Sequence, residues 1–353
     1  MASALVIGGT GFIGRHAVEN LLGHDYDVTS VSRSAPAFPF TDPTAVEHVT
    51  GDRTDQSTLE TLAAGRDPDV VVDCAAFFPQ DVESAVEVFA DVDAYVYVSS
   101  GGVYSRQEIP KREDDTPLHE CSPEQATDET MASYGPRKAE GDRVARSAAT
   151  RGVAAMSVRP CVLYGPRSMQ SQSITPTDAS PTWMDGMPVN QTLHDYWIER
   201  VDRFDRVVVP GDGTALWHRA YAADVADAIR IVAERGEPGE AYNVGDQRVC
   251  TLEDVIGLVA DTLGTSVDVV HASRRELARV GLAPDDFILY HHPMTGYPHV
   301  LETCKIRSLG WGSTPAEDAM ARTVTERIDH LRNRDETAPN RDAETRLLDA
   351  IAE

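Results

Sequence analysis

Hydrophobic and polar positions change their spacing repeatedly over the first 160 residues. Short apolar runs rich in β-branched residues predict buried strands near 4–8, 27–32, 46–50, 69–73, 94–99 and 153–159. Between these runs, apolar residues recur at helical spacing and predict helices near 12–23, 56–64, 81–90 and 133–151. The alternation predicts an α/β fold, in which a doubly wound parallel sheet carries helices on both faces.

The pattern is less regular in the rest of the chain. Further helices are predicted near 191–203, 222–234, 251–262 and 315–332, with a strand near 206–209. We expect a first domain over 1–165 and a smaller second half over 166–335, part of which returns to the first domain. A charged C-terminal tail covers 336–353, where Ala343–Ile351 has weak helical periodicity and predicts a frayed helix.

A glycine-rich turn joins the first strand to the first helix. Gly9, Gly11 and Gly14 fit the spacing G-x-G-x-x-G, which allows a tight turn and close backbone approach to a pyrophosphate. The N-terminus of the following helix supplies N–H donors for phosphate groups. This arrangement predicts an NAD(P)-binding Rossmann-like domain, and the alternative is a glycine-rich turn without a ligand. Cofactor contacts are expected from Gly8, Thr10, Gly11, Phe12, Ile13 and Gly14.

The end of the second strand bears on the choice of cofactor. An acidic residue there would bind the ribose 2′-hydroxyl of NAD, whereas an arginine can hold the 2′-phosphate of NADP. Arg33 occupies this region and no carboxylate does. The sequence therefore favours NADP over NAD, unless Arg33 is only a solvated surface charge.

Tyr134 and Lys138 lie four residues apart at the start of a predicted helix, and hence on one face of it. A nearby positive charge stabilises a phenolate and lowers the pKa of tyrosine, so the pair could transfer a proton. The chain has only three lysines, the other two being Lys111 and Lys305.

With the glycine turn and this pair, the chain resembles the extended branch of the short-chain dehydrogenase/reductase superfamily, the NAD(P)-dependent epimerase/dehydratase group. The resemblance covers roughly residues 3–335. Further segments match its pattern in order: 49–52, 70–76, 95–104, 159–166, 209–213 and 242–246. Loops at 105–130 and 167–190 would border the substrate cleft, the second of them as a lid.

The resemblance implies a role for each matching position. Ser100 would hydrogen-bond the substrate, Tyr134 would give or take its proton, and Lys138 would hold the nicotinamide ribose and lower the pKa of Tyr134. Further cofactor contacts are expected from Asp52, Arg53, Cys74, Ala75, Ala76, Ser99, Pro160 and Val162. Substrate contacts are expected from Ser100, Gly101, Tyr164, Trp217 and Arg219.

Three departures from the family pattern bear on the reaction and the substrate. Dehydratases of this group carry acidic residues just after the catalytic Ser or Thr, where this chain has Gly101 and Gly102, so a sugar 4,6-dehydratase is disfavoured. An Asn usual in the loop after strand six is Val162 here. An Arg that binds the diphosphate of nucleotide sugars is replaced by Trp217, and Arg219 lies two residues away. These losses weaken the case for a nucleotide-diphosphate substrate without excluding one.

Acidic residues exceed basic ones by 57 to 32, which gives a net charge of −25. Few lysines and many carboxylates resemble proteins of a high-salt cytoplasm, where salt screens the repulsion; an ordinary acidic protein is the alternative. The same charge disfavours nucleic-acid binding, which requires basic patches, although some relatives of this fold bind RNA.

Other features point to a soluble cytoplasmic protein. Met1 runs directly into the first strand, and no apolar run approaches the ~20 residues that span a bilayer. The five cysteines are scattered and predict reduced thiols. His291, His292 and His299 lack further ligands at suitable spacing, so a loop is favoured over a metal site and no metal is expected. The family commonly dimerises through the helix that carries the Tyr and Lys, so a homodimer is expected.

The function favoured by these features is an NAD(P)-dependent epimerase or oxidoreductase that acts on a sugar or nucleotide sugar through Ser100, Tyr134 and Lys138. One alternative is a reductase or dehydrogenase of a non-nucleotide alcohol or carbonyl compound. Another is a non-catalytic NADP-binding sensor or an RNA-binding relative. Such sensors usually lose the Tyr or the Lys, and this chain keeps both.

Overall fold

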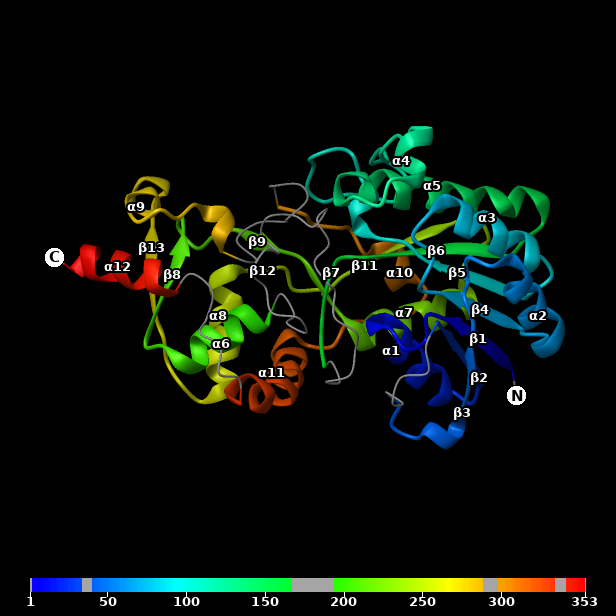
Figure 1. The fold of residues 1–353 in the computed structure, drawn as a ribbon, viewed down its shortest axis with the longest axis horizontal. Helices are drawn as coiled ribbons and strands as arrows, with labels where there is room; N and C mark the ends of the chain where they lie inside the picture. Colours follow the sequence, from blue (N-terminus) through cyan, green and yellow to red (C-terminus); the bar gives the residue numbers. More distant parts are fainter. Residues whose placement is uncertain (1, 34–39, 167–193, 288–297, 334–340, 353) are drawn as a thin grey trace.

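The computed structural model describes residues 2–33, 40–166, 194–287, 298–333 and 341–352. It consists of two halves that lie side by side along the longest axis (Figure 1). The larger half holds the N-terminus and a parallel sheet, and the smaller half holds the C-terminus and three short two-stranded sheets. The expected α/β class is confirmed.

The large sheet has seven strands, all paired in parallel, in the order β11-β6-β5-β4-β1-β2-β3. Their bounds are Ser3–Ile7 for β1, Asp27–Ser32 for β2, Val46–Thr50 for β3, Val70–Asp73 for β4, Ala94–Val98 for β5, Ala155–Pro160 for β6 and Ala241–Val244 for β11. The strand order reverses at β1, which lies between β2 and β4. In open parallel sheets, ligands bind outside the carboxyl ends of the strands at such a switch point.

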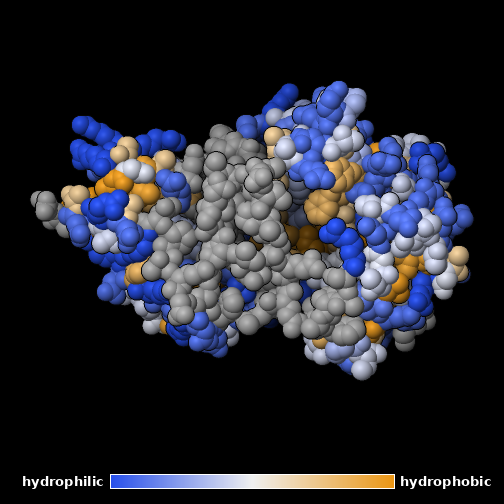
Figure 2. Space-filling model, in the orientation of Figure 1, coloured by the Kyte–Doolittle hydropathy of each residue, from blue (hydrophilic) through white to orange (hydrophobic). Residues whose placement is uncertain are grey.

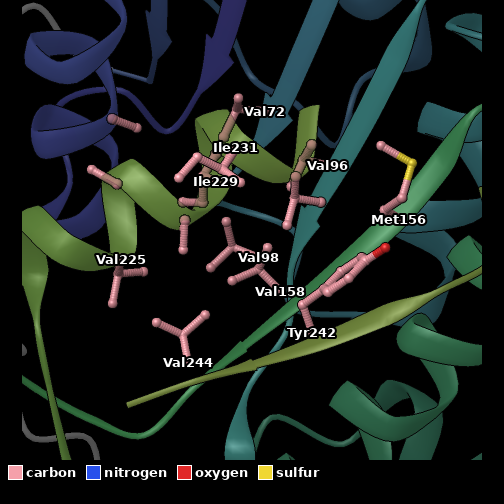
Figure 3. Packing of buried hydrophobic residues seen from close by; sticks show 14 of the residues in the cluster. Val72, Val96, Val98, Met156, Val158, Val225, Ile229, Ile231, Tyr242 and Val244 are labelled. Atoms are coloured by element: carbon pink, nitrogen blue, oxygen red, sulfur yellow. The ribbon is translucent and has the colours of Figure 1, made fainter. Parts of the chain in front are cut away.

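Helices cover both faces of this sheet. On one face, α1 (Phe12–Leu22) packs on α7 (Ala222–Arg235); on the other, α3 (Pro79–Val88) lies between α2 (Gln56–Arg66) and α5 (Tyr134–Ala148). Figure 3 shows Val96, Val98 and Val158 of the sheet packed against Val225 and Ile229 of α7. Burial of these apolar faces is the main force that holds the layers together.

The smaller half has its own apolar core, in which Trp197 is fully buried. Its helices are α6 (Asp195–Arg203), α8 (Leu252–Leu263), α9 (Arg274–Arg279), α11 (Ala316–Arg332) and α12 (Arg341–Ala352). Its paired strands are β7 (Val162–Tyr164) with β10 (Arg219–Tyr221), β9 (Leu216–Trp217) with β12 (Cys250–Thr251), and β8 (Arg206–Pro210) with β13 (Asp268–Ala272). Two short helices, α4 (Pro123–Thr127) and α10 (Cys304–Ser308), complete the described elements longer than one turn.

Two segments test the expectations for the second half and the C-terminal tail. The segment 242–246 lies within the second half expected over 166–335, part of which was expected to return to the first domain, and its residues 242–244 belong to β11, the edge strand of the large sheet. The terminal helix was expected to fray, but α12 packs on the second core through Leu347 and Leu348. Its Glu344 is fully buried and accepts the Val208 amide at 2.8 Å, so this carboxylate fixes the helix to strand β8. The expected lid at 167–190 lies outside the described residues.

Figure 2 shows hydrophilic residues spread over both halves of one face of the molecule. In the part of the chain that the structure describes, every helix is too short or too polar to cross a membrane.

Candidate active site

The glycine turn after β1 is closely packed, and no larger residue fits at two of its positions. Gly8 has φ of +81°, which favours glycine. A Cβ on Gly14 would lie 2.1 Å from the Gly8 carbonyl oxygen, so α1 can approach the turn only because Gly14 has no side chain. The first turn of α1 contains no acidic residue, and Gly11 provides no side-chain cap to its amides. These observations fit a helix N-terminus that receives a dinucleotide pyrophosphate.

Arg33 and Asp52 lie near each other at the ends of β2 and β3, and both are exposed. Hydrogen bonds from Thr54 lower the pKa of Asp52, and the charge of Arg33 contributes to the same shift. The region expected to hold the adenosine end of a cofactor therefore contains both a cation and a carboxylate.

Arg53 was expected to contact the cofactor, but its side chain is directed inward and is only 7% exposed. Its guanidinium pairs with Asp73 at 2.5 Å and with Asp81 at 3.1 Å. A cofactor contact through the Arg53 side chain is thus not supported by its position.

The loop that follows β4 contacts both the glycine turn and helix α5. The Asp73 carboxylate accepts the amides of Ala75 and Ala76 at 3.1 and 3.0 Å. A Cβ on Gly8 would lie 2.9 Å from the Cβ of Ala75, so the loop and the glycine turn are in contact. Burial raises the pKa of Cys74, which leaves its thiol protonated and a poor nucleophile.

Tyr134 is the first residue of α5. Ser100 lies two residues after Val98, the last residue of β5. The Ser100 hydroxyl accepts the Gly102 amide at 3.0 Å, and this turn packs on the start of α5, where a Cβ on Gly135 would lie 2.8 Å from the Gly102 carbonyl oxygen. Burial raises the pKa of Tyr134, while the Ser100 hydroxyl and the charge of Arg137 oppose the increase. The expected lowering of this pKa is thus wrong for the ligand-free chain, because desolvation outweighs the nearby positive charge.

Lys138 lies one turn after Tyr134 and is buried. Its Nζ donates to the carbonyl oxygens of Val98 at 2.8 Å and Ala76 at 3.0 Å, and lies 4.3 Å from the ring centroid of Tyr97. Burial lowers the pKa of Lys138 to about 8, although nearby carboxylates oppose the shift. The ammonium is thus held by two backbone carbonyls beside the proposed nicotinamide site.

Asp142, which the sequence analysis did not select, continues the same face of α5 four residues after Lys138. It forms a two-point ion pair with Arg159 of β6 at 2.6 and 2.9 Å, and both side chains are fully buried. Arg159 also donates to the Tyr104 hydroxyl at 2.9 Å, and Tyr104 donates to Asn243 of β11 at 2.7 Å. The four-residue spacing from Tyr134 to Lys138 to Asp142 was a signal that could have identified this residue.

Gly101 is buried, and a side chain does not fit there. A Cβ would lie 2.9 Å from Nε2 of His299 and 3.1 Å from the Pro160 carbonyl oxygen. Sequence spacing alone could not bring His299, almost two hundred residues away, to this position. The structure therefore gives a physical reason for the glycine where dehydratases carry an acid.

Among the expected substrate contacts, Tyr164 and Arg219 come together. The Arg219 guanidinium lies 4.7 Å from the ring centroid of Tyr164, whose hydroxyl donates to Asp246 at 2.7 Å. The His194 ring lies 5.2 Å from the Tyr164 ring. Arg219 and His194 are buried, and within the described residues their side-chain nitrogens have no hydrogen-bonding partner apart from the Cys250 thiol beside Arg219.

Val162 is partly buried in β7, where it is in register with Arg219. Trp217 belongs to β9, and its side chain lies outside the described residues. His291 and His292 also lie outside them, and no cluster of three metal-binding side chains occurs among the residues that are described.

Comparison with known proteins settles the family. The sequence model of the NAD dependent epimerase/dehydratase family matches residues 4–245. The chain belongs to this family. Its members are extended short-chain dehydrogenases/reductases, so the resemblance inferred from the motifs is confirmed and the chain is an NAD-dependent enzyme of the epimerase/dehydratase type.

Several curated proteins are similar to this epimerase/dehydratase-family chain. Low-salt glycan biosynthesis protein Agl12 of Haloferax volcanii is 24% identical over 335 residues, which cover 87% of this chain and 92% of that protein. The chloroplast stem-loop binding protein of 41 kDa b of Arabidopsis thaliana is 24% identical, over 77% of this chain and 66% of that protein. The dTDP-D-glucose 4,6-dehydratase of Mus musculus is 25% identical, over 91% of this chain and 87% of that protein.

Solved structures share the fold. The dTDP-glucose 4,6-dehydratase of Bacillus anthracis in complex with NAD matches with a TM-score of 0.67 at 19% identity, over 94% of this chain and 98% of that chain. The UDP-glucose 4-epimerase of Thermotoga maritima with UDP-glucose matches with a TM-score of 0.66 at 20% identity, over 93% of this chain and 99% of that chain. At these identities the likeness establishes the fold of the family and not the substrate.

Proposed function

We propose that the chain is an NAD(P)-dependent sugar or nucleotide-sugar epimerase or oxidoreductase that uses Ser100, Tyr134 and Lys138. The observation that carries the proposal is the close packing of the turn that holds Ser100 on the start of α5, where Tyr134 lies: a Cβ on Gly135 would lie 2.8 Å from the Gly102 carbonyl oxygen. Lys138 lies one helical turn from Tyr134, and its ammonium is held by the loop that touches the glycine turn.

A bound nicotinamide cofactor would accept hydride from a substrate carbon or return it. Tyr134 would hold the proton that leaves or enters the substrate hydroxyl, and Ser100 would orient that oxygen. The Lys138 ammonium would stabilise the phenolate once the substrate and cofactor exclude water, because charge interactions strengthen in a medium of low dielectric constant. Lys138 lies one helical turn from Tyr134, and the Val98 and Ala76 carbonyls hold its Nζ there.

The packing of Gly101 supports an epimerase or oxidoreductase over a 4,6-dehydratase. Elimination of water needs an acid or base next to the reacting carbon, and a side chain at 101 would meet the backbone of Pro160. The dehydratase relatives are therefore better guides to the fold than to the reaction of this chain.

The two candidate classes of substrate differ in charge, because a nucleotide sugar carries a diphosphate. The nucleotide-sugar enzymes among the structural neighbours support a nucleotide sugar. Arg219 could attract a diphosphate, but its guanidinium lies beside the Tyr164 ring in the ligand-free chain. A non-nucleotide alcohol or carbonyl compound is therefore the second candidate.

For the cofactor, Arg33 supports NADP, whereas NAD is the cofactor named for the Bacillus anthracis neighbour. If Arg33 holds a 2′-phosphate, Arg33→Ala should weaken NADP binding by more than it weakens NAD binding. Equal losses, measured by titration of both cofactors, would remove the basis for an NADP preference.

The central experiment assays purified protein in high salt with a panel of sugars and nucleotide sugars and with both cofactors. Tyr134→Phe should reduce turnover about 10²–10⁴-fold, the range for loss of a general acid or base. It should leave cofactor affinity unchanged, and full activity of this variant would exclude Tyr134 from the reaction. Cofactor that stays bound through purification would favour an epimerase, since epimerases return the hydride within one catalytic cycle.

A pH profile tests Lys138. Its pKa of about 8 lies below the ordinary 10.5, so the ammonium should lose its proton and the rate should fall as pH rises through about 8. Lys138→Met should weaken cofactor binding and slow turnover at every pH. An unaltered alkaline limb in Lys138→Arg, whose charge persists, would show that another group controls it.

We extend the proposal to a cytoplasmic homodimer adapted to high salt, which light scattering and thermal unfolding at low and molar KCl would test. The net charge of −25 supports salt-dependent stability, because salt screens repulsion between carboxylates. The same charge counts against an RNA-binding role like that suggested by the name of the chloroplast relative. Retention of Tyr134 and Lys138 counts against a sensor without activity.

A further inference from the structure

Arg53 lies three residues after the end of β3, next to the exposed Asp52, and its buried side chain reaches the end of β4 and the start of α3. Its guanidinium bridges two buried carboxylates, Asp73 at the end of β4 and Asp81 in the first turn of α3. Burial alone would lower the pKa of Arg53, but the charges of Asp73, Tyr95 and Asp81 raise it overall. The guanidinium is therefore charged, and it neutralises part of the charge of both carboxylates.

Each carboxylate uses one oxygen for Arg53 and the other for the loop. Asp73 binds Arg53 through Oδ2 and accepts the Ala75 and Ala76 amides through Oδ1, at 3.1 and 3.0 Å. The Tyr95 hydroxyl also donates to Asp73 Oδ2, at 3.0 Å.

Asp81 repeats the arrangement on the other side of the guanidinium. Its Oδ1 faces Arg53, and its Oδ2 accepts the amides of Phe77 and Phe78 at 2.9 and 3.0 Å. Four consecutive amides, from residue 75 to residue 78, are thereby held by two carboxylates that share one arginine.

The loop held in this way touches both parts of the proposed active site. On one side, Ala75 contacts the glycine turn at Gly8. On the other, the Ala76 carbonyl accepts Lys138 Nζ at 3.0 Å, and the Phe78 ring lies 4.9 Å from the guanidinium of Arg137. A shift of this loop would move Lys138 relative to the cofactor.

We propose that Arg53 is a positioning residue, which fixes residues 74–78 through Asp73 and Asp81 and thereby sets the place of Lys138 beside the nicotinamide. This inference rests on the proposed function for its kinetic consequence only. An arginine suits the task because its planar fork presents several donors in fixed directions, which the single ammonium of a lysine does not. Without Arg53, two carboxylates would face each other in a buried site, and their repulsion would open the loop.

The test compares Arg53→Met with Arg327→Met. Arg327 forms a buried two-point ion pair with Asp195 in the smaller half, at 2.8 and 3.0 Å, so both variants remove an arginine of similar burial and pairing. For each variant, amide hydrogen exchange, NAD affinity and kcat at saturating cofactor are measured. The kcat is calculated from the concentration of folded protein.

In Arg53→Met, the amides of 75–78 should exchange at least about tenfold faster, NAD should bind more weakly, and kcat should fall about 10–100-fold, as expected when catalytic groups are displaced by about 1 Å. Arg327→Met should lose stability while these three properties stay at wild-type values. If Arg53→Met does not fold, Asp81→Asn keeps an oxygen for the Phe77 and Phe78 amides and should show the same changes at smaller size.

The inference would be overturned by a folded Arg53 or Asp81 variant in which all three properties stay at wild-type values. These are the amide exchange of residues 75–78, the NAD affinity and kcat. Exchange and NAD binding need no turnover, so they still test Arg53 if no sugar substrate is found. Conversely, an active Tyr134→Phe enzyme would overturn the proposed function and leave the exchange result intact.

Discussion

Asp142 in the sheet half and Asp246 beside the smaller half are both buried aspartates close to an arginine, but they ionise differently. Asp142 is bound at two points by Arg159, and this attraction outweighs burial and lowers its pKa. Burial raises the pKa of Asp246 to about 6; the hydrogen bond from Tyr164 and the charge of Arg219, whose guanidinium forms no hydrogen bond with the Asp246 carboxylate, oppose this only in part. The geometry of the ion pair, rather than the mere presence of a nearby arginine, therefore decides whether the pKa of the buried carboxyl group is lowered or raised.

The difference distinguishes two kinds of site. On α5, the Asp142 carboxylate is matched at two points by Arg159, which also donates to the Tyr104 hydroxyl, as expected for a region that fixes the groups around it. Around Tyr164, buried groups of Arg219 and His194 have bonding capacity that is not used within the described residues. Buried nitrogens of this kind suit a region in which the substrate provides their hydrogen-bonding partner.

The largest effect is expected from Asp142→Asn, which leaves Arg159 as a buried cation with a weakened partner. Removing one member of a buried pair costs about 3–5 kcal/mol, measured as the free energy of unfolding in urea. The control is Asp268→Asn, which weakens the exposed pair with Arg206 and should cost less than about 1 kcal/mol. Similar small losses in both variants would contradict the contrast.

Asp246→Asn should show its effect through pH. A folded pKa of about 6, above the ordinary 3.8, means that Asp246 stabilises the fold most below pH ~4 and loses this contribution as pH rises through about 6. The difference corresponds to about 3 kcal/mol. The variant should therefore gain stability relative to wild type by about this amount between pH 4 and pH 7, and parallel stability curves would show that Asp246 ionises normally.

Gly101→Ala should cost about 1–3 kcal/mol, because its Cβ would press on His299 and on the backbone of Pro160. Gly257 in α8 is the matched control, because a Cβ there meets no atom within 4 Å. Gly257→Ala should raise stability by about 0.5–1 kcal/mol through helix propensity. Equal shifts in thermal unfolding would mean that the space at Gly101 is not limiting.

Arg219→Met should change the stability of the ligand-free protein least, by less than about 1 kcal/mol, because replacement of a poorly paired buried charge by an apolar side chain is often neutral. Substrate binding should weaken instead, and KM is the measurement. A large loss of stability would show that Arg219 is a structural partner of Asp246 and not a group reserved for substrate.

Local patterns in the sequence were sufficient for the first half of the fold, including the glycine turn and the start of α5. The glycine turn and the position of Tyr134 at a helix start depend on neighbouring residues, so spacing could predict them. Strand β11 was missed as part of the sheet because its four residues carry little periodicity and it pairs with β6 across more than eighty residues.

The contacts that organise the site could not be predicted in the same way. Arg53, Asp73 and Asp81 come from three different elements, and only the folded sheet brings them together. Arg53 was expected to contact the cofactor, whereas in the fold its guanidinium pairs with Asp73 and Asp81. The raised pKa of Tyr134 likewise depends on burial, which a spacing of four residues does not reveal.

The place of β11 and α7 at residues 222–244 has a practical consequence for dissecting the protein. A fragment cut at residue 165 would end after β6 without the helix that covers Val96, Val98 and Val158 (Figure 3). Its exposed strand edge and apolar face would favour aggregation during recombinant expression. Truncations meant to isolate the nucleotide-binding portion should therefore retain the chain through β11.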